Sequence, residues 1–224
     1  MPVSWAQLFG LLGWGTLVGV DLVSFPQALL SRPLIAGAGA GLVLGEPEAG
    51  FKIGLVLELF ALDVLPVGAA RYPDYGAGVV GAVVLASGAE PTFVLGIATL
   101  YALLFATLGG WSLQWLRRVN GRTLESAAAG LAAGDAATIR SVQYRGVAGD
   151  LVRSALLTAL AVGVAFWLRP RLPLTERMEL VSAVAVGTAV AAAASGAIRS
   201  AGREARLRWL AAGAGLGLLM AALR

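Results

Sequence analysis

The sequence contains no cysteine and no histidine. The absence of cysteine excludes disulfides and thiolate metal sites, and leaves no cysteine usage from which to judge the redox compartment. Imidazole and thiolate groups most often serve phosphoryl relays, metal ligation and proton shuttling near neutral pH. Any such chemistry therefore belongs to another chain, and we expect this one not to be an enzyme by itself and to hold no metal or cofactor.

Charge is also scarce. Only 13% of the residues are charged and 58% are hydrophobic, with a mean hydropathy of +0.80. Soluble domains have about 25% charged and about 45–50% apolar residues, so this composition predicts an integral protein of the lipid bilayer. At about 20 residues per spanning helix, the chain allows roughly six to eight membrane segments. The expected fold is an all-α, multi-pass helical bundle forming one transport domain.

The basic residues are unevenly placed. Residues 1–110 carry three basic and seven acidic residues, and residues 111–224 carry fourteen and six. The basic residues form no soluble patch, so a nucleic-acid partner is not expected. Residues 117–153 are polar and include six arginines, which predicts a cytoplasmic basic loop by the positive-inside rule. This loop separates a membrane region, 1–116, from C-terminal membrane helices, 154–224.

Prolines and glycines interrupt the N-terminal half. Pro26 and Pro33 each remove a backbone donor, so a continuous helix is not expected there. The apolar run PLIAGAGAGLVLG is too short for a full crossing, and Pro66 breaks the next long run. These features predict broken or half-spanning helices. GxxxG spacings at Gly15/Gly19, Gly37/Gly41 and Gly213/Gly217 predict closely packed helices and an oligomer.

Two carboxylates lie within the run GLVLELFALDVLPVG. An ionised Asp near the bilayer centre costs about 2.5–3.5 kcal/mol, so such groups face protein, water or substrate. On an unbroken helix, Glu58 and Asp63 would point about 140° apart, but a break at Pro66 allows them to converge. Broken helices inside a membrane require a polar cavity. Carboxylates and free carbonyls accept hydrogen bonds from sugar hydroxyls, which makes a sugar the favoured solute.

The candidate binding residues each have a structural alternative. Glu58 either binds the solute or forms a structural hydrogen bond to a broken neighbouring helix, and Asp63 is equally open. Asp21 and Gln27 lie on the proline-broken segment, where Gln27 is the better sugar ligand and Arg32 is expected to anchor an interface or a carboxylate. The last two candidates are Asp74 and Arg71, but a turn-making role explains Asp74 in YPDYG, and Arg71 could simply be its ion-pair partner.

Together these residues resemble a known family. The stretch SFPQALLSRPLIAGAGAGLVLGEPEAGFKIGLVLELFALDVLPVGAARYPDYG is similar to the membrane C component (enzyme IIC) of mannose-family, phosphoenolpyruvate-dependent sugar phosphotransferase systems, which include fructose and sorbose systems. The resemblance is strongest over about residues 20–80 and extends to RRVNGR. The matching positions are Asp21, Gln27, Arg32–Leu34, Gly41–Glu46, Ala49–Gly50, Leu57–Glu58, Val67–Ala70 and Pro73–Asp74. Pro66 and Arg71–Tyr72 differ from the mannose-type pattern, which leaves the sugar open.

The resemblance implies a sugar-translocating subunit in the bacterial cytoplasmic membrane. It implies a homologous membrane D component as partner, and soluble A and B proteins that pass phosphate from phosphoenolpyruvate to the sugar. Two other classes stay open. One is a cation-coupled secondary transporter in which Glu58 or Asp63 carries a proton or sodium ion. The other is a non-transporting membrane scaffold that retained the fold.

Overall fold

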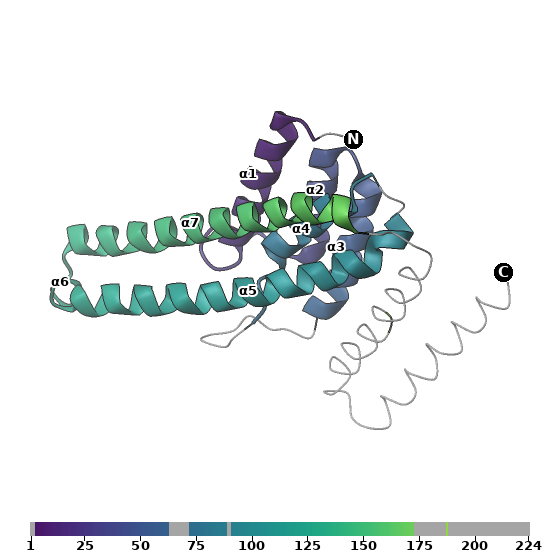
Figure 1. The fold of residues 1–224 in the computed structure, drawn as a ribbon. Helices are drawn as coiled ribbons and strands as arrows, with labels where there is room; N and C mark the ends of the chain where they lie inside the picture. The colour runs from purple at the N-terminus through teal and green to yellow at the C-terminus, as the bar shows by residue number, and fades with distance from the viewer. Residues whose placement is uncertain (1–2, 63–71, 89–90, 173–186, 188–224) are drawn as a thin grey trace, which may run out of the picture.

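The computed structural model describes residues 3–62, 72–88, 91–172 and 187, and these residues form helices joined by short connections (Figure 1). In chain order the elements are α1 (Trp5–Asp21), α2 (Pro33–Leu44), α3 (Pro47–Ala61), α4 (Tyr75–Ala86), α5 (Pro91–Ser126), α6 (Ala128–Ala132), α7 (Ala136–Leu168) and a 3-10 turn, η1 (Arg169–Arg171). The described part contains no strand, which agrees with the expected all-α fold.

The first two helices are separated by the break that the prolines predicted. α1 begins at a capping box, in which Ser4 and Gln7 satisfy each other's backbone N–H groups, and it ends at Asp21. α2 starts only at Pro33, which occupies a first-turn position where no backbone donor is needed. The two helices then run antiparallel, since the Gln7 amide donates to the carbonyl of Leu44 and the Trp14 indole donates to that of Ala36.

α2 is short, as its sequence predicted. Its 12 residues measure about 18 Å, against a hydrocarbon core of about 30 Å. Gly45 adopts a left-handed φ of 79° and closes α2, and Pro47 starts α3 two residues later. The resulting hairpin is very tightly packed, because Gly37 and Gly41 of α2 face Gly50 and Gly54 of α3. The predicted close packing at Gly37/Gly41 is therefore confirmed within the chain.

The α2–α3 contact supplies a stability prediction. A Cβ added at Gly54 would lie 2.7 Å from the carbonyl oxygen of Pro33 and 3.0 Å from the Cα of Leu34, both backbone atoms that cannot swing away. We expect Gly54→Ala to lower the free energy of unfolding by about 1–3 kcal/mol. Gly13→Ala is the matched control: it lies on α1 with open space around it, and should be neutral or slightly stabilising. Thermal unfolding in detergent measures both, and an unchanged Gly54→Ala protein would contradict this packing.

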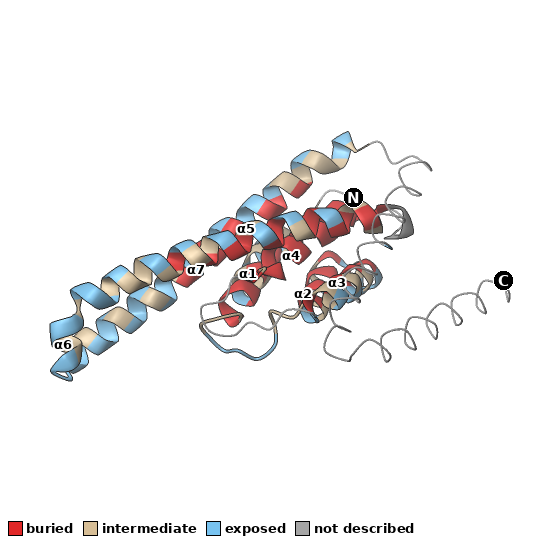
Figure 2. Cartoon of the chain, turned by 90° about the horizontal axis from the view of Figure 1, so that it is seen from below, coloured by how far each residue is buried: buried red, intermediate tan, exposed pale blue. Residues whose placement is uncertain are grey.

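α4 lies at the centre of the described part. All 12 of its residues are buried, and it packs on α1, α2, α3, α5 and α7. Figure 2 shows this concentration of buried residues around α4, with exposed residues prevailing toward α6. Like α2, α4 is too short to cross a bilayer. It is a half-length helix surrounded by protein, the arrangement in which broken helices are tolerated in membranes.

The polar segment 117–153 does not form the loop that we expected. α5 continues through it to Ser126, and α7 starts at Ala136, so the two helices form a long hairpin with α6 at its tip (Figure 1). Hydropathy identified only the apolar part of each helix and missed the alanine-rich stretches, which have high helix propensity. Two helices of the described part are long and apolar enough to cross a membrane, Val94–Ser126 and Ala136–Arg171.

The tip of the hairpin is built by local capping. Gly134 takes a left-handed φ of 68°, and the Asp135 carboxylate then accepts hydrogen bonds from the amides of Ala137 and Thr138. The hydrogen bond from the Thr138 hydroxyl has the largest effect, and together with the two amide hydrogen bonds it lowers the pKa of Asp135 below its ordinary value. The carboxylate of Asp135 is therefore fully charged above the ordinary carboxyl range. Its contribution to the free energy of unfolding is lost as pH falls through the lowered pKa.

α1 and α7 meet through small residues. A Cβ at Gly15 would collide with the side chain of Thr158, and one at Gly19 would lie 2.6 Å from the hydroxyl of Ser154. The Gly15/Gly19 spacing thus brings α1 against α7, as close packing of small residues predicts. Gly213/Gly217, in the C-terminal membrane helices, lies outside the described residues. The predicted oligomer is not tested by a single chain and stays a prediction.

Candidate functional site

The connection between α1 and α2 is shaped by Asp21. This residue is only 2% exposed, and its two carboxylate oxygens accept from the amides of Ala28, at 2.6 Å, and Ser31, at 2.9 Å. Gln27 and Leu29 both adopt positive φ angles, 57° and 65°. Such conformations in side chains other than glycine cost about 1–3 kcal/mol each and cluster at functional sites. The connection is therefore a strained loop held in place by a buried carboxylate.

Glu58 lies beside the start of α2. Its Oε1 accepts from the guanidinium of Arg32, with Nε at 2.7 Å, and the pair forms a salt bridge. Its Oε2 accepts from the amide of Leu34 at 3.1 Å. A carboxylate at a helix N-terminus also interacts favourably with the helix dipole. The geometry thus shows the structural alternative for Glu58, a bond to a broken neighbouring helix, and it shows Arg32 anchored to a carboxylate as expected.

A cavity with both polar and apolar lining opens between this loop and α4. Its volume is about 430 Å³, and its walls include Asp21, Gln27, Ser31, Arg32 and Tyr72. Asp21 and Gln27, both predicted from the sequence, therefore reach the cavity. Glu58 is not in its wall, but its partner Arg32 is. Carboxylate, amide, hydroxyl and guanidinium groups converge here, which gives a small polar solute both donors and acceptors.

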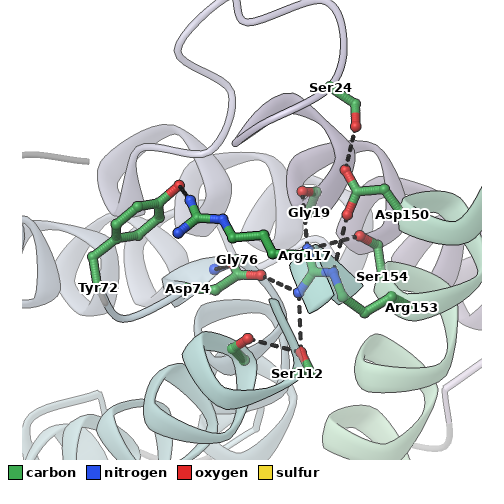
Figure 3. A network of polar contacts seen from close by, with 11 residues as sticks. Gly19, Ser24, Tyr72, Asp74, Gly76, Ser112, Arg117, Asp150, Arg153 and Ser154 are labelled. Atoms are coloured by element: carbon green, nitrogen blue, oxygen red, sulfur yellow. Dashed lines mark hydrogen bonds and ion pairs between the residues drawn. The ribbon is translucent and has the colours of Figure 1, made fainter. Parts of the chain in front are cut away.

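Asp74 takes part in a different structure. It caps α4 by accepting from the amide of Gly76 at 3.2 Å, as the turn-making reading of YPDYG predicted. Its other oxygen forms an ion pair with Arg153 of α7 at 2.8 Å, drawn in Figure 3. The expected partner, Arg71, lies outside the described residues, as does Asp63, so their binding roles stay predictions.

Arg153 is the centre of a buried network that sequence reasoning missed. Only 7% of the residue is exposed, and it donates to Asp74, Asp150, Ser112, Ser154 and the carbonyl of Gly19 (Figure 3). Asp150 in turn accepts from the hydroxyl of Ser24 at 2.6 Å, which ties the loop to α7. One signal was available: an Asp and an Arg three residues apart in GDLVRSALL, where the polar sequence turns apolar.

No group of three or more metal-ligating side chains comes together in the part of the chain that the structure describes. Some charged groups there are paired with one another, as in the Arg153 network and the Arg32–Glu58 pair, whereas the carboxylate of Asp21 accepts from backbone amides.

Comparison with known families decides the classification. The model of the sorbose-specific IIC component of phosphotransferase systems matches residues 5–172. The chain belongs to this family. The resemblance inferred from residues 20–80 is thereby confirmed, and the matched region extends through α7 and η1.

Curated IIC components share parts of this sequence. The sorbose-specific component of Lacticaseibacillus casei is 39% identical over 74 residues, which cover 33% of this chain and 26% of that protein. The sorbose-specific component of Klebsiella pneumoniae is 33% identical over 99 residues, 44% of this chain and 36% of that protein. A putative N-acetylgalactosamine permease IIC component 2 of Escherichia coli is 30% identical over 105 residues, 46% of this chain and 78% of that protein. The matched segments thus span only about a quarter to a third of the two sorbose components.

Two solved structures have a similar fold. One, described as a membrane protein, has a TM-score of 0.74 at 19% identity and covers 99% of this chain and 96% of that one. The other is the cryo-EM structure of the mannose transporter ManYZ in complex with microcin E492. Its TM-score is 0.65 at 20% identity, covering 100% of this chain and 89% of that one. At these identities the likeness shows the fold, and it agrees with an all-helical membrane protein of the IIC family.

Proposed function

We propose that this chain is the sugar-translocating membrane subunit of a mannose-family phosphotransferase system, a multi-pass protein of the bacterial cytoplasmic membrane. The observation that carries this proposal is the cavity of about 430 Å³ at the strained loop between α1 and α2, whose wall includes Asp21, Gln27 and Arg32. It lies in a chain whose exposed surface is rich in large apolar side chains. Broken helices around a polar cavity are typical of membrane transport sites.

In this proposal the sugar lies against Asp21, Gln27, Ser31 and Arg32. Gln27 both donates and accepts, and the guanidinium of Arg32 donates to ring or hydroxyl oxygens. Glu58 accepts hydrogen bonds from two guanidinium nitrogens of Arg32, so it orients this side chain in the cavity wall. Asp63, Asp74 and Arg71 were also proposed from the sequence. Asp74 fits a supporting role here, because its carboxylate is engaged with Gly76 and Arg153.

The phosphoryl chemistry is assigned to partners. We propose that a homologous membrane D component completes the transport unit and that soluble A and B components carry phosphate from phosphoenolpyruvate. A chain without histidine or cysteine lacks the side chains that most often form such phosphoryl intermediates. The proposal therefore gives this chain no catalytic step of its own.

A cation-coupled transporter is less consistent with the site. A carboxylate that binds a proton or sodium ion within a membrane needs a negative charge that no neighbouring cation already compensates. The charge of Glu58 is already compensated by Arg32, and that of Asp74 by Arg153. Both carboxylates therefore already have a cationic partner, whereas Asp63, the other carboxylate considered for a cation, lies outside the described residues.

Uptake by membrane vesicles distinguishes these functions. Vesicles containing this chain and its neighbouring gene products are supplied with labelled sugars, with and without phosphoenolpyruvate, and with a protonophore. We expect phosphorylated sugar to appear inside only with phosphoenolpyruvate, and the protonophore to have no effect. Accumulation of free sugar that the protonophore abolishes would indicate a secondary transporter and contradict the proposal. Vesicles without this chain are the control.

A further inference from the structure

A second cavity, with a mainly polar lining, borders the same loop. Its volume is about 370 Å³, and it is bounded by the loop, by α5 and by α7. Its polar lining consists of Ser24, Gln27, Tyr72, Arg117, Asn120 and Asp150. This volume is within the range of small-molecule sites, about 300–1,000 Å³. The contacts already described for these residues do not account for an open polar space between the loop and the α5–α7 hairpin.

The two cavities share one wall, made of Leu22, Gln27 and Tyr72. Tyr72 is held by Arg117, whose guanidinium donates to the Tyr72 hydroxyl at 2.8 Å and lies 5.1 Å from the centre of its ring. Gln27, by contrast, is exposed and has a left-handed backbone conformation. Among the contacts described, its side-chain amide donates only to the nearby carbonyl of Val23. The wall thus combines one anchored aromatic ring with one side chain on a strained loop.

We propose that the second cavity is a transit subsite for the sugar, entered from the first cavity past Gln27 and Tyr72. The inference rests on the proposed function and adds a second station to it. The guanidinium of Arg117 and the amides of Asn120 and Gln27 supply donors and acceptors for hydroxyl groups. Asp150 is already bonded to Ser24 and Arg153, so it shapes the subsite and holds the loop. Arg117 and Asn120 belong to the arginine-rich hairpin, which we expect on the cytoplasmic side.

Gly146 offers a direct way to fill the second cavity. It lines that cavity from α7, and a Cβ added there would meet only the amide nitrogen of Asn120, at 3.9 Å. A leucine at this position is compatible with the helix and occupies space in the second cavity, and Gly146 itself does not line the first cavity. Gly146→Ala controls for loss of the glycine. Gly121→Leu is the matched bulky control, because Gly121 has open space around it and lines neither cavity.

The experiment uses the full chain with its membrane partner in vesicles, and compares equilibrium binding of the transported sugar with its uptake. We expect Gly146→Leu to bind sugar within about twofold of the original affinity and to lose uptake by about tenfold or more, because it obstructs the path after binding. The Gly121→Leu protein should transport normally, and Gly146→Ala should retain more uptake than Gly146→Leu. Normal uptake by Gly146→Leu overturns the subsite, and so does loss of binding and uptake together in a stably folded protein. If the unmodified complex neither binds nor transports sugar, the proposed function itself fails.

A second measurement, based on thiol reactivity, tests the subsite even if the protein does not fold with leucine at position 146. The natural chain has no cysteine, so Gly146→Cys introduces the single thiol of this subunit. We expect saturating sugar to slow the reaction of this thiol with a small methanethiosulfonate reagent by about fivefold or more, as occupancy of a confined site requires. The Gly121→Cys thiol should react at the same rate with and without sugar. Equal reactivity of Gly146→Cys under both conditions would overturn the subsite.

Discussion

Replacing Arg153 with methionine is expected to destabilise the protein more than any other single change considered. The substitution leaves Asp74 and Asp150 buried, at 2% and 1% exposure, without their cationic partner. Removing one member of a buried ion pair costs about 3–5 kcal/mol, because the remaining charge stays desolvated and uncompensated. For a chain of this size we expect the unfolding midpoint to fall by roughly 10 °C.

Thermal unfolding of the detergent-solubilised chain measures this effect. Arg140→Met is the matched control, because Arg140 is exposed on the same helix and donates to the carbonyl of Ala136 one turn earlier. It should change the midpoint little. Introducing Asp74→Asn into the Arg153→Met protein should lower the free energy of unfolding less than Asp74→Asn does in the original protein. Effects of substitutions at interacting residues are not additive. Additive effects of the two substitutions would contradict a direct Asp74–Arg153 interaction.

Glu58→Gln is expected to weaken sugar binding by about tenfold or more, which corresponds to about 1.4 kcal/mol. The glutamine keeps the volume, but replaces one acceptor oxygen with an NH₂ donor where Arg32 and the amide of Leu34 both donate. One of these donors loses its acceptor, and Arg32 loses the charge that holds it in the wall of the first cavity. Membrane insertion should be unaffected.

Sugar binding to the purified complex measures the effect, together with thermal stability of the same samples. Glu48→Gln is the control: Glu48 lies on the same helix, is 75% exposed in its side chain and pairs with Lys52, so its loss should leave sugar affinity unchanged. A Glu58→Gln protein that binds sugar normally, whether or not it is less stable, would remove Glu58 from the site.

The local breaks of the fold were predictable from the sequence. Proline positions predicted the end of continuous helix after Asp21 and the new start at Pro33, because proline acts on its own backbone and that of its immediate neighbours. The small-residue spacing at Gly37 and Gly41 predicted close packing. The length of α5 and α7 was not predicted, since hydropathy detects contact with lipid, whereas Ala-rich polar turns extend a helix beyond it.

The polar network was beyond sequence reasoning for a different reason. Asp74 and Arg153 are separated by 79 positions, and no helical periodicity relates them. Asp74 was singled out as a binding candidate because a carboxylate in an apolar sequence needs a partner. The sequence indicated that need, but only the packing of α7 against α4 showed which residue meets it. For Glu58, likewise, the sequence left ligand and structural partner open, and the fold brought Arg32 beside it.

The location of bound sugar tests the central claim most directly. We would determine a cryo-EM map of the complete membrane complex in a saturating concentration of the sugar that the vesicles accumulate. The account predicts sugar density in the first cavity, within hydrogen-bonding distance of Gln27 or Arg32. Density confined to a place remote from the loop between α1 and α2, with this cavity filled only by solvent, would contradict it.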